Sequence, residues 1–418
     1  MGKDQFDIEK LKQEKKAKKL EQKKLSQNQQ QTQQQQQPKP FVRSFHVIPN
    51  RKQLAKPPLG TFTIMSFNIL GQCLVKRKLF PDSGDMLKWK LRRNMVSAEL
   101  ELYKPDVMCL QEVDNYEQYY KPILERLGYN AQYTKHDKKL HGLLIAYNPK
   151  VFEMTKYETV DYDDNAKCPK TWITSNIGQV MGLRHVDHPN FGLVVGNTHL
   201  YWRPVAIYER VRQATLYIDK IISVKKSLEE AEPDTQWVPM PIGDFNMNPT
   251  GASLSAITMV RIPPEKEEQL EDSRKNPGSL MKKSSDGEEE AATEEAPAEQ
   301  DEPSEAVDHE TSSNTMPTSE LIAIVHKEAP EAWHSVYSCH GSIDPNTSDP
   351  VSGEPKFTNY TAAFKNTLDY MLLRRDEASL AATEILVLPP EESMKPSLPN
   401  RNFGSDHMCL LARFEFAV

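Results

Sequence analysis

The sequence predicts a single α/β domain whose strands run in mixed directions. From Thr61 onward, short apolar runs alternate with amphipathic segments, and six polar clusters each adjoin one of the apolar runs. The clusters are spread from Asn68 to His407, which favours one domain, although 418 residues would also accommodate two.

Two segments have the periodicity of amphipathic helices. Each places five apolar residues on one face, and the first would end at Pro105. The first set is Leu87, Leu91, Met95, Ala98 and Leu102, and the second is Ile207, Val211, Ala214, Ile218 and Ile221. Strands are predicted at 142–147, 177–183 and 192–198.

The six polar clusters supply carboxylates, amides and imidazoles at the ends of the apolar runs. Four clusters follow their run and two precede it. The four are 66–68, 110–112, 197–199 and 243–246, and the two are 368–370 and 405–407. If the runs are strands of mixed direction, the ends of four and the beginnings of two can lie along one sheet edge. That edge would be an active site.

These clusters contain the residue types that metal-assisted phosphodiester hydrolysis requires. The reaction needs neutralised phosphoryl oxygens, a water in line and a stabilised leaving oxygen, and Mg²⁺ with oxygen ligands supplies much of this. Glu112, Asn68 and Asp406 are hard oxygen donors suited to Mg²⁺. Asp244 and Asn246, two residues apart, can place a carboxylate base and an amide beside one water.

Three further residues complete the candidate site. His199 and His407 can donate hydrogen bonds to phosphoryl oxygens, and Asp369 can fix the tautomer of His407. Each cluster alone has an ordinary explanation as a turn or a helix start. Their joint occurrence favours the catalytic interpretation, because six ordinary explanations would have to coincide with a full set of ligands, base and imidazoles.

Two polar segments are expected to lie outside the packed domain. Residues 1–60 have a net charge of +9 and include a Gln-rich run, which predicts a disordered tail. A segment from about 265 to 317 is rich in Glu, Ser, Ala and Pro, and its part from 265 to 310 has a net charge of −12. We expect it to be a disordered insertion within a domain of residues 61–418, because candidate residues lie on both sides.

Composition gives expectations for how the chain would bind a substrate and for where in the cell it would be found. The rest of the chain has a net charge of −4, so a nucleic-acid enzyme of this kind would depend on a local basic rim and its metal ions. The five cysteines form no CxxC pair, and the chain has no apolar stretch of about 20 residues and no signal core. A reducing, cytoplasmic or nuclear location without membrane attachment or secretion is expected.

In their order, the clusters resemble the endonuclease/exonuclease/phosphatase superfamily, which shares the DNase-I-like fold. The likeness covers about residues 61–418 without the acidic insertion. It implies an α/β four-layer sandwich, with two mixed β-sheets packed face to face and helices outside. It also implies two Mg²⁺ ions, replaceable by Mn²⁺, with Glu112 as principal ligand and Asn68, Asp244, Asn246 and Asp406 completing the metal environment.

Two blocks resemble the deadenylase-like branch, which contains the fungal Ngl RNA exonucleases, Nocturnin, Angel and the Ccr/Not deadenylase subunit. One block contains Asn359 and Phe364, and the resemblance implies that Phe364 stacks on a substrate base. The other contains Arg203 and Pro204, and it implies that Pro204 helps to sandwich a base. Asn359 and Arg203 are expected to contact the substrate as well.

The chain departs from this branch at two positions. Tyr201 replaces a second histidine of the Ccr/Not subunit, and His141 stands where an acidic residue often precedes the glycine. The first departure weakens the implication of strict poly(A) preference. The Lys/Gln-rich tail and the acidic insertion are most similar to the Ngl group.

The resemblance implies a Mg²⁺-dependent 3′-to-5′ RNA exonuclease that releases nucleoside 5′-monophosphates, in ribosomal RNA 3′-end processing or poly(A) shortening. The expected partners are the RNA 3′ end and ribosomal-precursor or mRNA-decay proteins that contact the tail or the insertion. A monomer that binds neither DNA nor a membrane is expected.

Two alternatives remain open. The same fold could act as a phosphatase or a DNA phosphodiesterase, although His199 argues against the DNA-repair branch and Met247 against inositol phosphatases. A catalytically silent RNA-binding adaptor is the second alternative. The expected residue at every matched catalytic position argues against it.

Overall fold

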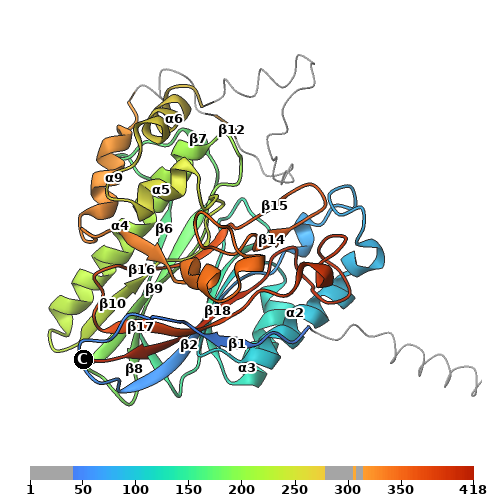
Figure 1. The fold of residues 1–418 in the computed structure, drawn as a ribbon, viewed down its shortest axis with the longest axis horizontal. Helices are drawn as coiled ribbons and strands as arrows, with labels where there is room; N and C mark the ends of the chain where they lie inside the picture. The colour runs from blue at the N-terminus through green and yellow to red at the C-terminus, as the bar shows by residue number, and fades with distance from the viewer. Residues whose placement is uncertain (1–40, 278–304, 307–313) are drawn as a thin grey trace, which may run out of the picture. The chain divides into compact units, whose positions relative to one another are not determined.

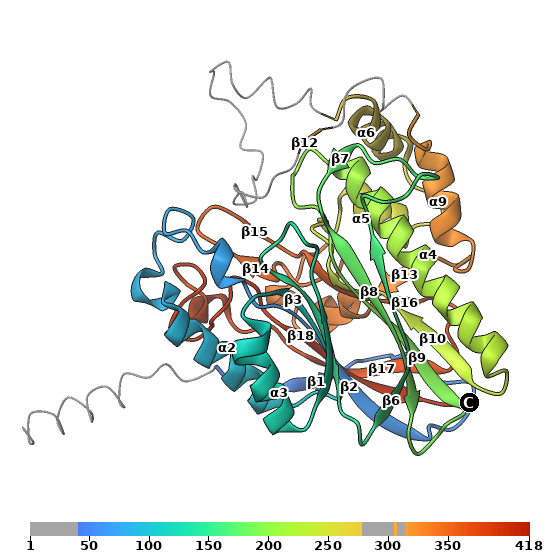
Figure 2. The same ribbon diagram turned by 180° about the vertical axis from the view of Figure 1, so that it is seen from behind.

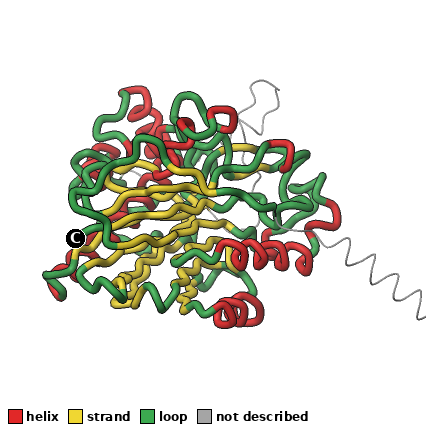
Figure 3. The backbone as a smooth tube through the Cα atoms, turned by 60° about the horizontal axis from the view of Figure 1, so that its bottom comes forward, coloured by secondary structure: helices red, strands yellow, loops and turns green. Residues whose placement is uncertain are grey.

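The computed structural model describes residues 41–277, 305–306 and 314–418 (Figure 1). These residues form two mixed seven-stranded β-sheets, with helices outside them. Figure 3 shows the strands in the middle and helices on both sides. The predicted four-layer α/β sandwich is therefore confirmed.

The first sheet has the strand order β1-β17-β18-β2-β3-β5-β4. Within it, β2 and β3 run parallel, whereas the other neighbouring pairs are antiparallel. All seven residues of β3 are buried, because a strand covered on both faces needs a nearly continuous apolar run. The bounds are β1 Phe45–Val47, β2 Gly60–Asn68, β3 Val107–Val113, β4 Asn130–Thr134, β5 Gly142–Tyr147, β17 Leu380–Leu386 and β18 Leu410–Phe416.

The second sheet has the order β13-β16-β11-β9-β8-β6, and β10 pairs with β9 beside this path. Here β9 runs parallel to both β10 and β11, and the other pairs are antiparallel. The bounds are β6 Phe152–Asp161, β8 Ile177–His185, β9 Phe191–His199, β10 Gln236–Met240, β11 Ile242–Asp244, β13 Trp333–Ser335 and β16 Asp369–Arg374.

The core lies between the two sheets. Ile64, Cys109 and Ile145 of the first sheet belong to the same buried cluster as Met181 and Val195 of the second. Alternate residues of each strand point to this layer and the others to the helices, because side chains alternate along a strand. The three strands predicted around 142, 177 and 192 are confirmed as β5, β8 and β9.

Helices cover the outer face of each sheet (Figures 1 and 2). On the first sheet, Val96 of α2 and Leu124 of α3 pack in a cluster with Met65 and Leu110. On the second sheet, α4 is the main helix, with α5, α6 and α9 beside it. Their bounds are α2 Trp89–Tyr103, α3 Lys121–Leu127, α4 Ile207–Ala231, α5 Ala252–Thr258, α6 Pro264–Lys275 and α9 Thr318–His326. No helix in this described part combines the length and apolar character that a bilayer span requires.

One predicted helix face is confirmed and the other is confirmed only in part, since Met95 of α2 is buried but Leu91 and Ala98 are half-buried. In α4, Val211, Ala214, Ile218 and Ile221 are buried as expected. In α2, the buried set includes Arg92 and Glu99, whereas Leu102 is 41% exposed. Both charged side chains are buried because they have polar partners, and an apolar pattern does not reveal such partners.

The prediction of a disordered tail over residues 1–60 was wrong for residues 41–60. Residues 1–40 lie outside the described residues, but residues 41–60 are described and include β1, which pairs with β17. Arg43 is 5% exposed, and its Nη2 donates to Glu99 Oε1 at 3.2 Å and to the carbonyl oxygen of Cys409 at 2.9 Å. These hydrogen bonds hold a polar segment that composition alone assigns to the tail.

The expected insertion differs from the structure at its two ends. Residues 278–304 and 307–313 lie outside the described residues, but 264–275 form α6, with Leu270 fully buried. Ser273 Oγ donates to the carbonyl oxygen of Val205 at 2.8 Å, and Glu271 Oε1 accepts from the backbone N–H of Thr318 at 2.9 Å. One apolar side chain and a few hydrogen bonds thus anchor a helix whose composition is mostly polar.

Candidate active site

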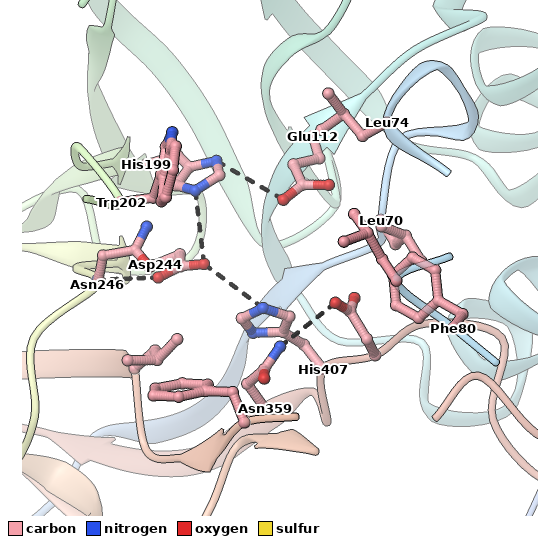
Figure 4. Close-up of a pocket in the computed structure, with 14 residues that line it drawn as sticks. Leu70, Leu74, Phe80, Glu112, His199, Trp202, Asp244, Asn246, Asn359 and His407 are labelled. Atoms are coloured by element: carbon pink, nitrogen blue, oxygen red, sulfur yellow. Dashed lines mark hydrogen bonds and ion pairs between the residues drawn. The ribbon is translucent and has the colours of Figure 1, made fainter. Parts of the chain in front are cut away.

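A pocket of about 550 Å³ opens at one end of the two sheets (Figure 4). Eight of the predicted site residues line it, together with six further residues. The eight are Glu112, His199, Asp244, Asn246, Asn359, Phe364, Asp406 and His407, and the six are Leu70, Leu74, Leu79, Phe80, Trp202 and Leu368.

The polar clusters come from both sheets and not from one edge of a single sheet. Asn68 and Glu112 lie at the ends of β2 and β3, whereas His199 and Asp244 end β9 and β11. The expectation of one sheet edge was wrong in this respect. The site forms where two facing sheets end together, because inward-pointing side chains from both meet there.

Glu112 is held in a strained position at the centre of the pocket. It lies in a bulge of β3 and has a φ of 56°, which few residues other than glycine adopt. Its Oε1 accepts from Asn68 Nδ2 at 2.8 Å, and its Oε2 accepts from the backbone N–H of Gly71 at 3.0 Å. Burial favours the neutral acid, but His199, His141 and the Asn68 amide hold the pKa of Glu112 below its ordinary value.

Asn68 lies between two carboxylates of the site. Its Nδ2 also donates to Asp244 Oδ2 at 3.0 Å, so the amide bridges two carboxylates. Its Oδ1 accepts from the backbone N–H of Leu70 at 3.0 Å, and this donor fixes which amide atom faces the carboxylates. In this structure Asn68 therefore donates to both carboxylates, and its role as a metal ligand stays a prediction.

Asp244 is the last residue of β11 and follows a position that requires glycine. Gly243 has a φ of 145°, and a Cβ there would lie 2.1 Å from the carbonyl oxygen of Thr198. Asp244 Oδ1 accepts from the backbone N–H of Asn246 at 2.9 Å. Burial, with the nearby charge of Asp369, raises the pKa of Asp244 to about 7. A carboxylate with this pKa can take up a proton at neutral pH.

Two imidazoles face Asp244 from either side. His407 Nδ1 is 2.8 Å from Asp369 Oδ2, which is the pairing expected from the sequence, and His407 Nε2 is 3.7 Å from Asp244 Oδ2. His199 Nε2 is 3.6 Å from the same Asp244 oxygen, and its Nδ1 is 4.0 Å from Glu112 Oε1. Although burial opposes it, the Asp369 carboxylate raises the pKa of His407 well above its ordinary value. This shift favours the protonated form of His407 beside the pocket.

The buried carboxylate and amide oxygens of the pocket fit a hard divalent cation as ligands. Glu112 and Asp406 are 5% and 7% exposed, and burial raises the pKa of Asp406. Asn359 Nδ2 donates to Asp406 Oδ2 at 3.3 Å, while Asn359 Oδ1 is buried without a hydrogen-bond partner among the described residues. A cation would compensate both the buried charges and this oxygen.

A second set of possible ligands has a simpler explanation. Asp244, Asp369 and His407 offer atoms that all lie within 4.8 Å of one another. Asp369 and His407 are already joined by a hydrogen bond of 2.8 Å. We therefore interpret this pair as orienting the imidazole, and the predicted ligands Glu112 and Asp406 stay the candidates for holding a cation.

A second pocket of about 520 Å³ adjoins the first and shares Trp202, Asn246, Phe364 and Leu368 with it. Pro204 lines this second pocket, so both residues expected to hold a base are found along it. Arg203 lines neither pocket. Its guanidinium lies over the indole rings of Trp172 and Trp202, at 5.3 and 5.4 Å from their centroids.

Sequence reasoning missed two parts of the site. Phe80 and Leu79 form an apolar wall from the loop after β2, and only a lone aromatic in a polar stretch marks it in the sequence. Arg92 of α2 is 1% exposed, and its guanidinium donates to the carbonyl oxygens of Leu70 and Gly404. It ties together two loops that carry site residues. No sequence signal separates it from Arg93, the half-buried arginine that follows it.

With this geometry established, the chain can be compared with known proteins. The model of the endonuclease/exonuclease/phosphatase family matches residues 65–407, which include all six polar clusters. The chain belongs to this family. The predicted class of hydrolytic phosphodiesterase is thereby confirmed.

Named family members support the predicted branch. The chain is 29% identical over 386 residues to a probable RNA exonuclease of Schizosaccharomyces pombe, covering 84% of this chain and 76% of that protein. It is also 29% identical over 415 residues to RNA exonuclease NGL2 of Saccharomyces cerevisiae, covering 87% and 80%. The crystal structure of ANGEL2, a 2′,3′-cyclic phosphatase, superposes with a TM-score of 0.61 at 22% identity, over 90% of this chain and 98% of that one. This last likeness concerns the fold alone.

Proposed function

We propose that this protein is a divalent-metal-dependent 3′-to-5′ RNA exonuclease that releases nucleoside 5′-monophosphates. The observation that carries the proposal is that two pockets adjoin and share lining residues. The first is lined by buried carboxylates and imidazoles, and the second by Pro204, Trp202 and Phe364. A phosphodiester placed in the first would bring the adjacent base to the second. The RNA exonuclease names of two relatives, each aligned over more than four fifths of this chain, support the choice of RNA.

The residues of the first pocket suggest a division of labour for in-line hydrolysis. Asp244, with its raised pKa, orients a water and accepts its proton. The phosphorus–oxygen bond that breaks is the one to the ribose 3′-oxygen of the upstream nucleotide, so the phosphate stays on the released 5′-monophosphate. His407 and His199 donate hydrogen bonds to the phosphoryl oxygens, and Asp369 keeps His407 in the required orientation.

Glu112 and Asp406 would hold Mg²⁺, or Mn²⁺ in its place, and Asn359 Oδ1 would face it. The bound metal would neutralise the phosphoryl oxygens and stabilise the leaving 3′-oxygen. The resemblance to the family suggests two such ions. The natural RNA would be a ribosomal RNA precursor or a poly(A) tail, which the Ngl-like relatives suggest.

The test uses an RNA labelled at its 5′ end and carrying a free 3′ hydroxyl. We expect a ladder of products shortened one nucleotide at a time, with 5′-monophosphates released, and we expect chelation of divalent metal to stop it. Glu112→Gln and Asp244→Asn should each lower the rate by at least about 100-fold.

The matched control is Glu125→Gln, which makes the same chemical change on the exposed side of α3 and should leave the rate unchanged. Intact RNA with the wild-type protein, or normal trimming by both site variants, would contradict the proposal. Release of inorganic phosphate without chain shortening would indicate a phosphatase instead.

A further inference from the structure

The first pocket has an apolar wall that the catalytic chemistry does not explain. Leu70, Leu74, Leu79 and Phe80 form this wall, and none of them lines the second pocket. Leu74 and Leu79 are half-buried, and Leu79 packs against the buried cluster that contains Leu70 and Phe80. Phosphodiester hydrolysis uses charged and polar groups, so an apolar surface in the same pocket is free to contact another part of the substrate.

Leu70 is held in the wall by strained backbone. Its φ is 56°, in the left-handed region that a bulky side chain rarely adopts. Its N–H donates to Asn68 Oδ1 at 3.0 Å, and its carbonyl oxygen accepts from the guanidinium of Arg92. Strain of this kind persists only where the surroundings over-determine the backbone, and it clusters at sites that bind ligands.

The loop that carries the wall, residues 69–88, is fixed to the acidic residues of β3 and of the segment after it. The backbone N–H of Gly71 donates to Glu112 Oε2 at 3.0 Å, and that of Cys73 donates to Asp114 Oδ2 at 2.9 Å. The wall is therefore a preformed surface, and covering it with a ligand costs little in ordering of the loop.

The wall and the second pocket lie on different sides of the reacting centre. In Figure 4, the labelled wall residues lie on the side of Glu112, whereas Trp202 and Asn246, which the two pockets share, lie on the side of Asp244. A phosphodiester at the centre would therefore have an apolar surface on each side.

Each phosphodiester joins two nucleosides, and the second pocket accounts for only one of them. In an in-line displacement the attacking and leaving oxygens lie on opposite sides of phosphorus. With the water at Asp244, the leaving 3′-oxygen is directed away from Asp244 and toward the side of Glu112. The ribose on that oxygen belongs to the upstream nucleotide, so this nucleoside is directed at the wall.

We propose that the apolar wall binds the base of the upstream nucleoside, the one whose 3′-oxygen leaves. The inference rests on the proposed exonuclease function. Every base has an apolar face, so contact with such a surface does not depend on the base sequence. This subsite would hold the penultimate base of an RNA while Pro204 and Phe364 hold the 3′-terminal one.

The charge of the same loop fits a nucleic-acid strand. Arg77 and Lys78 are exposed and lie in the chain between the two half-buried leucines of the wall. The acidic residues of the loop, Asp82 and Asp85, line a different pocket that contains none of the wall residues. The segment between the two leucines is thus basic, which suits a strand whose phosphates continue upstream.

Oligonucleotides that lack one base test the proposal. RNAs of one sequence are compared in three forms: intact, with hydrogen in place of the 3′-terminal base, and with hydrogen in place of the penultimate base. For the first cleavage by wild-type protein, we expect removal of the penultimate base to lower kcat/KM at least about fivefold. This factor corresponds to about 1 kcal/mol, the low end of the range for one stacked base.

The double variant Leu74→Ala/Leu79→Ala removes the half-buried part of the wall. It should lose a similar factor on intact RNA and nothing further when the penultimate base is absent, because two changes that delete one contact are not additive. Removal of the 3′-terminal base should still lower its kcat/KM, since the second pocket is unchanged.

Two comparisons separate this contact from an effect on folding. Leu74→Met/Leu79→Met keeps an apolar surface of similar volume and should retain the wild-type response to each RNA. The matched control is Leu102→Ala, because Leu102 is 41% exposed on α2 and lines neither pocket. It should change no value.

Binding of the three RNAs to Asp244→Asn, with and without the two alanine substitutions, gives a readout that does not require turnover. We expect Kd to follow the same pattern as kcat/KM. Equal losses by the alanine variant on intact RNA and on RNA without the penultimate base would mean that the leucines only support the loop, and would overturn the subsite. No loss on either RNA would overturn it as well.

Two further outcomes are distinct from these. Coupling of the leucines to the 3′-terminal base would reverse the assignment of the two nucleosides and overturn the proposal. If wild-type protein trims no RNA, it is the exonuclease function that fails, and the binding measurements alone then decide whether the wall contacts the penultimate base.

Discussion

At the scale of single residues, the site is built from side chains on strained backbone. Glu112 and Asn246 have φ values of 56° and 50°, which lie in the left-handed region that glycine adopts most readily. Glu112 is held by Gly71 and Asn68, and Asn246 Nδ2 donates to the carbonyl oxygen of Leu200 at 2.9 Å. The surrounding hydrogen bonds keep both side chains aimed into the pocket, which explains why strain is tolerated at these places.

The Asp369–His407 pair gives a prediction about the orientation of the His407 imidazole that can be measured apart from any effect on folding. In Asp369→Asn the pKa of His407 should fall, because the carboxylate that raises it is removed. The kcat should fall at least about 10-fold, since the imidazole loses both its fixed tautomer and its stabilised charge. Titration of the His407 ring protons by NMR in the metal-free protein measures the first effect, and steady-state kinetics the second. An unchanged pKa would contradict the pairing.

Glu354 gives a prediction on pH and stability away from the site. Burial raises the pKa of Glu354 to about 8, and Ser335 Oγ donates to its Oε2 at 3.1 Å. The folded state therefore binds a proton between pH 4.5 and 8 that the unfolded state releases, so the free energy of unfolding should fall as pH rises through this window. The slope from this one group is at most about 1.4 kcal/mol per pH unit.

Glu354→Gln is the matched test of that slope, because it keeps the size of the side chain and removes the titration. Urea unfolding of both proteins at pH 5, 6, 7 and 8 should show the variant gaining stability relative to wild type as pH rises. A constant difference across the series would mean that Glu354 titrates normally in the folded protein.

At the scale of elements, the packing of β11 against β9 depends on one glycine. Gly243→Ala places a Cβ 2.1 Å from the carbonyl oxygen of Thr198, at a φ of 145°. We expect a loss of stability well above 1 kcal/mol and a fall in activity, because the same shift moves Asp244 away from Asn68. Thermal unfolding and RNA trimming measure the two effects.

Gly128→Ala is the comparison for that variant. Gly128 also has a positive φ, 88°, but a Cβ there meets nothing within 4 Å. Its cost should be about 1 kcal/mol, from the left-handed backbone alone. Similar losses in the two variants would contradict the close approach of β9 and β11.

At the scale of the whole molecule, the boundary of the acidic segment decides which residues can be deleted without loss of stability. The composition marks 265–317 as a unit, but α6 belongs to the packed domain through Leu270, Ser273 and Glu271. Deleting 264–277 should lower the melting temperature by several degrees, because a buried leucine and two hydrogen bonds to neighbouring segments are lost. A deletion of 280–302, which removes no described residue, is the control and should change it much less. Equal effects would contradict the packing of α6.

The sequence by itself determined the fold class, the strands that carry the site and most of the residues that line it. Glu112, His199, Asp244 and His407 could be predicted because each lies where an apolar run begins or ends, and the chain therefore places them at strand ends. Phe364 and Pro204 came from resemblance to the family, and they do line adjoining pockets.

Only the tertiary structure decided which atoms meet. Three features depend on contacts between residues that are far apart in the chain. They are the sharing of the site between two sheets, the hydrogen bonds of Asn68 to two carboxylates, and the hydrogen bonds of buried Arg92 to two loops. The apolar wall of the first pocket likewise arises where a loop is held by side chains from other elements. Periodicity reports how one segment meets an apolar core, whereas hydrogen-bond partners and cavities are properties of several segments packed together.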